Sequence, residues 1–134
     1  MDKKDLAIGL HDKKYNCCQA VACSFAEEAG MDMKTLFKLG EGFGAGMGGR
    51  KCTCGALSGA VMLAGCINSD GNTDAPATKA ETYVLTEEIT RKFIDRVGAH
   101  VCEDIKGSTD GVVKCSCPDC IKIGVDLVSE VLKL

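Results

Sequence analysis

The fold is decided by residues 54–66, which read CGALSGAVMLAGC. Three alanines recur there every four residues, Ala56, Ala60 and Ala64, and Gly55 and Gly59 lie beside them. On an α-helix this spacing places the small residues on one face, where a neighbouring helix can approach closely. We therefore expect this stretch to form a central helix that is buried among its neighbours.

Helical signals also dominate the rest of the chain, and no stretch of useful length shows the alternation of a strand. A run from Cys17 ends at Gly30, and Asp32 is a helix-capping residue type. Residues 78–81 match a capping box, and the glycine-rich segment 40–49 predicts a loop without regular structure. We expect an all-α fold in which residues 1–134 form one domain, a bundle of about five or six helices. The expected helices cover residues 3–13, 17–29, 32–39, 54–66, 78–97 and 121–132.

The charge of the chain argues against two classes of partner. Sixteen Lys and Arg against 19 Asp and Glu give a net charge of −3, without a long run of either sign. Nucleic acids and membrane surfaces call for a clustered basic patch, so neither partner is expected. The first residues lack the apolar region of a signal peptide, and the longest apolar stretch, Thr53 to Ile67, is too short for a bilayer. We expect a cytoplasmic protein.

The cysteine content is the most informative part of the composition. Ten of the 134 residues are cysteine, far above ordinary usage. In a reducing compartment this density is typical of metal binding or redox chemistry rather than of structural disulfides. The cysteines form four groups: Cys17, Cys18 and Cys23; Cys52, Cys54 and Cys66; Cys102; and Cys115, Cys117 and Cys120.

Position along the expected helices separates candidate ligands from core residues. Cys54 and Cys120 lie at or near expected helix N-termini, where the helix dipole lowers the pKa of a thiol. Metals, iron–sulfur clusters and disulfide exchange all require such thiolates. Cys23 and Cys66 lie within apolar helical stretches and are expected in the core. Both histidines are expected on the surface.

Several motifs run through most of the chain in a specific order. The chain has Asn16-Cys17-Cys18-Gln19-Ala20-Val21, then GFGAGMG at residues 42–48, CGALSG at residues 54–59, and finally Cys102 and Cys120. In this order they resemble the N-C-x-Q-A-V opening, the glycine-rich segment, the C-G-A-x-x-G signature and the last two cysteines of the C-GCAxxG-C-C family of redox-active proteins. That family is also similar to the iron–sulfur part of split-Soret cytochromes c, whose haem-attachment motifs this chain lacks.

The resemblance implies a redox-active iron–sulfur protein that transfers or stores electrons and works with a redox partner protein. The cysteines that it nominates as ligands of a 2Fe–2S or 4Fe–4S cluster are Cys17, Cys54, Cys102 and Cys120. Six cysteines depart from the family pattern, and Cys52, Cys115 and Cys117 are further candidate ligands. Backbone N–H groups at Gly44, Gly46 and Gly55 are expected near the sulfur atoms, where such donors stabilise a reduced cluster. A homodimer is compatible with this function.

Two other functions stay open at this point. A dithiol–disulfide oxidoreductase would use Cys117 with Cys120, or Cys52 with Cys54, as its exchanging pair, although the βαβ context of such motifs is missing. A structural zinc protein would use Cys115, Cys117, Cys120 and one partner. No nucleophile triad, general base or substrate pocket can be named, so the sequence does not predict an enzyme.

Overall fold

The computed structural model describes residues 2–134, confirms the all-α prediction and contains no strand in that range. These residues form eight α-helices: α1 Lys3–Asp12, α2 Cys17–Ser24, α3 Ala26–Ala29, α4 Met33–Gly40, α5 Gly55–Asn68, α6 Lys79–Val97, α7 Cys102–Ile105 and α8 Cys117–Leu132. A 3₁₀ turn, η1, covers Glu41–Phe43, and a turn with π-helical hydrogen bonds, η2, covers Gly46–Arg50.

Two local features raise the number of helices above our prediction. The expected helix over residues 17–29 is interrupted at Phe25, whose φ of −112° and ψ of 22° separate α2 from α3. Gly30 then ends α3 in the left-handed conformation, as predicted. The four-residue helix α7 lies in a stretch where the sequence predicts no helix.

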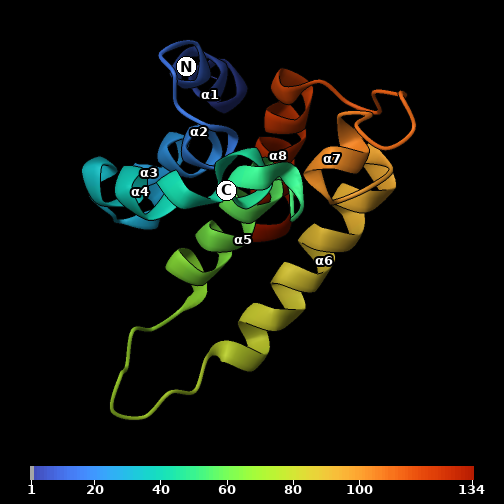
Figure 1. Ribbon diagram of the computed structural model, residues 1–134. Helices are drawn as coiled ribbons and strands as arrows, with labels where there is room; N and C mark the ends of the chain where they lie inside the picture. The colour runs from blue at the N-terminus through green and yellow to red at the C-terminus, as the bar shows by residue number, and fades with distance from the viewer. Residues whose placement is uncertain (1) are drawn as a thin grey trace.

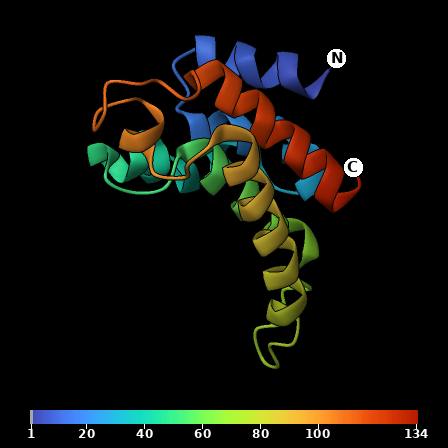
Figure 2. The same ribbon diagram turned by 90° about the vertical axis from the view of Figure 1, so that its right-hand side faces the viewer.

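Helix α5 is the centre of the packing, as predicted. It packs against α2, α6 and α8, while α1 lies along α2 and α8 (Figures 1 and 2). The C-terminal part of α5, the N-terminal part of α6 and the loop between them project away from the other helices (Figures 1 and 2). The N-terminal end of α5 therefore lies inside the bundle, at the end of the helix opposite to this projection.

Close packing on α5 requires glycine at two helix crossings. A Cβ atom at Gly59 of α5 would lie 2.7 Å from the Cys18 carbonyl oxygen of α2. A Cβ atom at Gly124 of α8 would lie 3.0 Å from the Ala56 carbonyl oxygen of α5. Because no side chain separates these backbones, α2 and α8 are held directly against the same helix.

Asn16 and Gln19 anchor the start of α2. Each side chain accepts a hydrogen bond from the other residue's backbone N–H at 2.9 Å, which is a capping box. The same side chains donate to backbone carbonyls at the end of α4 and just beyond it, Gln19 to Phe37 at 2.9 Å and Asn16 to Glu41 at 3.0 Å. These bonds attach the beginning of the glycine-rich segment to the first turn of α2.

The glycine-rich segment differs from our prediction because it contains η1 and η2. Its backbone is nevertheless unusual, since Ala45, Met47 and Arg50 have left-handed φ values of 53°, 64° and 63°. Each such residue other than glycine costs roughly 1 kcal/mol. Strain of this kind is found at functional sites more often than elsewhere.

The predicted capping box at residues 78–81 is wrong, although α6 begins where it was expected. The side chain of Thr78 makes no capping hydrogen bond, and its ψ of −7° is helical rather than extended. No helix within residues 2–134 has both the length and the apolar character needed to cross a bilayer.

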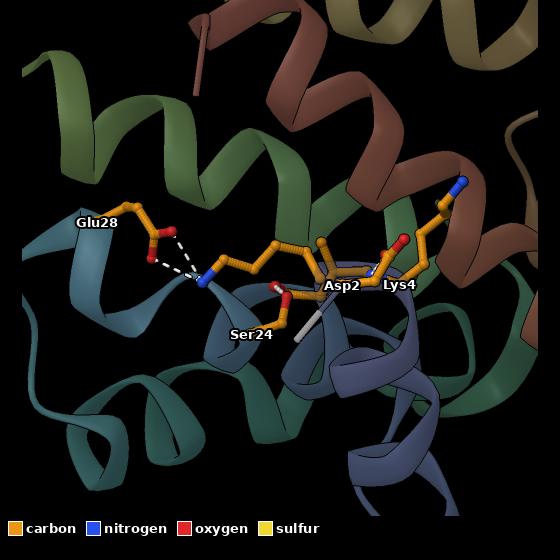
Figure 3. Close-up of polar contacts among 6 residues, drawn as sticks. Asp2, Lys4, Ser24 and Glu28 are labelled. Atoms are coloured by element: carbon orange, nitrogen blue, oxygen red, sulfur yellow. Dashed lines mark hydrogen bonds and ion pairs between the residues drawn. The ribbon is translucent and has the colours of Figure 1, made fainter.

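Ion pairs link α1 to its neighbours at the surface. The Lys3 ammonium of α1 lies 2.8 Å from the Glu28 carboxylate of α3. Figure 3 shows the Glu28 carboxylate with the dashed lines that mark its polar contacts. Lys4 pairs with Asp126 of α8 at 3.4 Å. Exposed pairs contribute less than about 1 kcal/mol each, so α1 is held mainly by its buried residues Ala7 and Leu10.

Candidate functional site

Four cysteines from separate segments line one cavity at the N-terminal end of α5. Cys17, Cys102 and Cys117 are the first residues of α2, α7 and α8, and Cys54 directly precedes α5. The cavity has a volume of about 210 Å³. Its other lining residues are His11, Asn16, Ala45, Gly46, Arg50, Gly55 and Lys106.

A short backbone ladder places Cys54 beside Cys102. Residues 53 and 101 form an isolated antiparallel bridge. On either side of it, the Cys54 N–H donates to the His100 carbonyl at 2.7 Å and the Cys102 N–H donates to the Cys52 carbonyl at 2.8 Å. These hydrogen bonds fix the backbones of Cys54 and Cys102 side by side, and thereby set the positions from which their two thiols extend.

The thiols of Cys17 and Cys117 form a hydrogen-bonded pair. The hydrogen bond from Cys17 is the largest of the effects that lower the pKa of Cys117 to about 5, and the charges of Lys106 and His11 add to it against the cost of burial. The same hydrogen bond and burial raise the pKa of Cys17. The two shifts are opposite in direction, which favours the thiolate on Cys117 and the proton on Cys17.

Cys54 and Cys120 form a second pair of this kind. The Cys120 thiol and, to a smaller extent, the backbone N–H groups of Ala56 and Leu57 stabilise the Cys54 thiolate and lower its pKa to about 7 despite burial. This confirms the effect predicted for a thiol at the start of α5. The matching prediction for Cys120 is wrong, because Cys120 donates the proton to Cys54 and its pKa is raised.

One lysine lies among these thiols. The Lys106 ammonium donates to the Cys115 carbonyl at 3.2 Å and lies 3.9 Å from the Cys120 sulfur. It also lowers the pKa of Cys117, and its charge acts on Cys17 and Cys54 as well. The thiolates of both pairs thus share a single half-buried counter-ion.

Glycine allows the backbone to pass close to two of the predicted ligand cysteines. A Cβ atom at Gly46 would lie 2.5 Å from Cys102 Cβ, and one at Gly55 would lie 3.3 Å from Cys17 Cβ. Gly46 and Gly55 line the cavity. Gly44 is buried against the Asn16 side chain instead, where a Cβ would lie 2.5 Å away.

A comparison with protein families matches residues 15–131 to the family described as "Putative redox-active protein (C_GCAxxG_C_C)". The chain belongs to this family. The C-GCAxxG-C-C match covers every element from α2 to nearly the end of α8, and with it the whole cavity lining except His11. No significant match was found among curated proteins or among solved structures.

The C-GCAxxG-C-C pattern and the cavity agree on three cysteines and differ on the fourth. Cys17, Cys54 and Cys102 line the cavity, whereas the fourth lining cysteine is Cys117. Cys120, which the pattern nominates, is fully buried behind Cys54.

The other cysteines lie outside the cavity. Cys115 is half-buried and hydrogen-bonded to Cys120, while Cys52 is exposed. Cys23 is buried in the core, as predicted, and burial raises its pKa to about 11. Cys66 is only half-buried but packs against the same core. All ten thiols are free within residues 2–134, and no three His, Cys, Asp or Glu side chains there are arranged to hold a single metal ion.

Our sequence analysis missed three basic residues of the cavity: His11, Arg50 and Lys106. Lys106 follows Cys102 by four residues, so a helix at that point would have indicated a shared face. His11 was expected on the surface but is half-buried against the thiols. Arg50 is brought there by the left-handed backbone of η2, which no local pattern predicts.

The lowered pKa of Cys117 predicts its reactivity. In the reduced, metal-free protein at pH 6, iodoacetamide should alkylate Cys117 well before the buried Cys18 and Cys23, because only thiolates react. Its rate should stay level from pH 6 to pH 8 and fall about tenfold per unit below pH 5, where the thiolate is protonated. Fragmentation of the tryptic peptide 115–122 locates the label. A rate for Cys117 that still rises tenfold per unit between pH 7 and pH 8 would contradict this assignment.

Proposed function

We propose that this protein binds an iron–sulfur cluster in the thiol-lined cavity and transfers or stores electrons. The observation that carries this proposal is the convergence of Cys17, Cys54, Cys102 and Cys117 on one cavity of about 210 Å³. Cysteine thiolates are the usual ligands of such clusters, and four of them suffice for either a 2Fe–2S or a 4Fe–4S centre. A bound cluster would supply one-electron redox chemistry, with electrons exchanged with an external carrier protein.

The chemistry of the cavity fits an anionic cluster. The donors are soft sulfur atoms, and two of them, on Cys54 and Cys117, are thiolates near or below neutral pH. The charged and titratable side chains that line the cavity beside the thiols are those of His11, Arg50 and Lys106, and no carboxylate is among the lining residues in the described chain. A set of thiolates gains from such neighbours because the cations offset their mutual repulsion.

The remaining residues of the cavity position these sulfurs. The N–H groups of Ala56 and Leu57, at the start of α5, help to lower the pKa of Cys54, and N–H groups close to a ligating sulfur tune the potential of a metal centre. Asn16 sets the first turn of α2 and therefore the place of Cys17. Cys17 and Cys102, whose pKa values are raised, must lose their protons on binding, so uptake of iron should be weaker at low pH.

Anaerobic reconstitution with ferrous iron and sulfide tests the proposal. We expect a brown protein with broad visible absorption and with iron and acid-labile sulfide in stoichiometric amounts. A colourless protein with one bound zinc would support the structural alternative instead. The same assay on Cys117→Ala and Cys120→Ala identifies the fourth ligand, since loss of iron in the first variant alone would favour the cavity lining over the family pattern.

Disulfide exchange is a second candidate, favoured by the hydrogen-bonded pair of Cys17 and Cys117. The Cys117 thiolate would attack a disulfide of a partner and displace one of its thiolates. Cys17 would then resolve the mixed disulfide, so that two electrons pass to the partner and the pair is oxidised. A colourless, metal-free protein with a reversible two-electron couple, and a Cys17–Cys117 disulfide in its oxidised form, would support this function.

A further inference from the structure

The thiol centre comprises the four cavity cysteines, Cys17, Cys54, Cys102 and Cys117, together with the adjacent Cys120. We propose that Lys106 is the internal counter-ion of this thiol centre and sets its reduction potential. The statement about the reduction potential rests on the proposed iron–sulfur function. Lys106 ends α7, and its ammonium lies 3.2 Å from the Cys115 carbonyl and 3.9 Å from the Cys120 sulfur. Among the lining residues of the cavity it stands beside Cys17, Cys54, Cys102 and Cys117. One cation is thus in reach of sulfurs from α2, α5, α7 and α8.

The other charges near Lys106 do not neutralise it. Within residues 2–134, none of the ion pairs with a carboxylate involves Lys106. The neighbouring Glu103 pairs with Lys51 at 3.0 Å, and Asp104 accepts a hydrogen bond from Thr109. The negative charge available to Lys106 is therefore that of the thiol centre itself.

The position of Lys106 differs from that of the other two basic residues of the cavity. Arg50 is exposed and lies on the strained turn η2, and His11 reaches the cavity from α1, outside the segments that carry the cysteines. Lys106 is half-buried and its hydrogen bonds hold it against the segment of Cys115 and Cys120. A buried charge is less screened by solvent than an exposed one, so Lys106 should have the largest effect.

A fixed positive charge beside the thiol centre changes its reduction potential in a defined direction. Reduction adds one negative charge to the centre, and a nearby cation stabilises the reduced form more than the oxidised form. Removal of that cation should therefore shift the midpoint potential to a more negative value. The substitution Lys106→Met keeps most of the length of the side chain and removes the charge, and Lys106→Arg keeps the charge.

The matched control is Lys114→Met. Lys114 lies in the same connection between α7 and α8, but its ammonium pairs with Asp110 at 3.5 Å and is absent from the cavity lining in the described chain. Its replacement removes the same charge from the protein without removing it from the thiols. Any change that reflects net charge alone should therefore appear in both variants.

Two measurements test the inference, one with the cluster and one without it. In reconstituted protein, the midpoint potential should become more negative in Lys106→Met, return toward the wild-type value in Lys106→Arg and stay unchanged in Lys114→Met. In metal-free protein, Cys117 is alkylated in parallel with anionic iodoacetate and neutral iodoacetamide. The ratio of the two rates should fall about fivefold in Lys106→Met alone, since an ammonium attracts only the anionic reagent.

The possible results separate the two proposals. Wild-type protein that takes up no iron and sulfide would overturn the proposed function, and the alkylation ratio would still decide whether Lys106 supplies charge to the thiols. Equal potentials and equal ratios in the wild type and in Lys106→Met would overturn the role of Lys106 alone. A changed rate with the neutral reagent at a constant ratio would show a loss of structure rather than of charge, and would also overturn it.

Discussion

Replacing Cys54 with alanine should leave the reconstituted protein without iron or acid-labile sulfide. Cys54 is 2 % exposed and precedes α5 directly, where the first N–H groups of the helix help to lower its pKa to about 7. Cys54 also connects two other cysteines of the site, because it is paired with Cys120 and is fixed beside Cys102 by the backbone ladder. Iron and sulfide per protein and the visible absorption spectrum measure the loss, and circular dichroism checks that the helices remain.

The control for this experiment is Cys66→Ala. Cys66 lies on the same helix α5, but at its other end, and packs against the core without lining the cavity. The same atoms are deleted in both variants, so the difference between them isolates ligation from packing. We expect Cys66→Ala to bind iron and sulfide as the wild type does. Equal loss in both variants would show that the division into ligand and core cysteines is wrong.

Gly59→Ala should destabilise the metal-free protein by about 2 kcal/mol, although the change adds a single methyl group. The new Cβ would lie 2.7 Å from the Cys18 carbonyl oxygen, 3.1 Å from Val21 Cβ and 3.3 Å from Cys18 Cα. Two of these atoms are backbone, so α2 itself has to move away from α5. Urea unfolding of the reduced protein, followed by circular dichroism at 222 nm, measures the change in the free energy of unfolding.

Gly65→Ala is the matched control on the same helix. A Cβ atom at Gly65 would meet no atom within 4 Å, so the substitution tests helix propensity alone. It should stabilise the protein by about 0.5–1 kcal/mol, since alanine loses less conformational entropy than glycine in a helix. Opposite signs for the two variants are expected. A destabilisation of equal size in both would show that the small-residue face of α5 does not depend on its contact with α2.

The helices that the sequence predicts well are those with strong local signals. The left-handed Gly30 ends α3, Asp32 caps α4 by accepting from the Thr35 N–H, and the apolar residues 54–66 form the buried helix α5. Errors arise where a local pattern competes with tertiary contacts. Phe25 is 1 % exposed and interrupts a helix that its neighbours favour. Helix α7 is too short to show a period at all.

In the candidate site, too, the sequence predicted what depends on local signals and missed what depends on tertiary contacts. The sequence identified cysteine as the residue type of the site. Helix N-termini and family motifs then separated candidate ligands from the rest of the ten cysteines. Their pairing was not, because Cys17 meets Cys117, and Cys54 meets Cys120, across separate helices. The three basic residues were also missed, because nothing in their immediate sequence links Lys106, Arg50 or His11 to a thiol.

The sequence by itself determined that this chain is helical, that α5 is central and that the chain resembles a cysteine-rich family of redox-active proteins. These properties depend on spacing along a helix and on residue type, and both can be read locally. Only the tertiary structure decided which thiols share a proton, which four line the cavity and which cation lies among them. The reason is physical: a thiol's pKa and a cation's effect depend on distance in space and on burial, and contacts such as that of Gly59 with α2 set both.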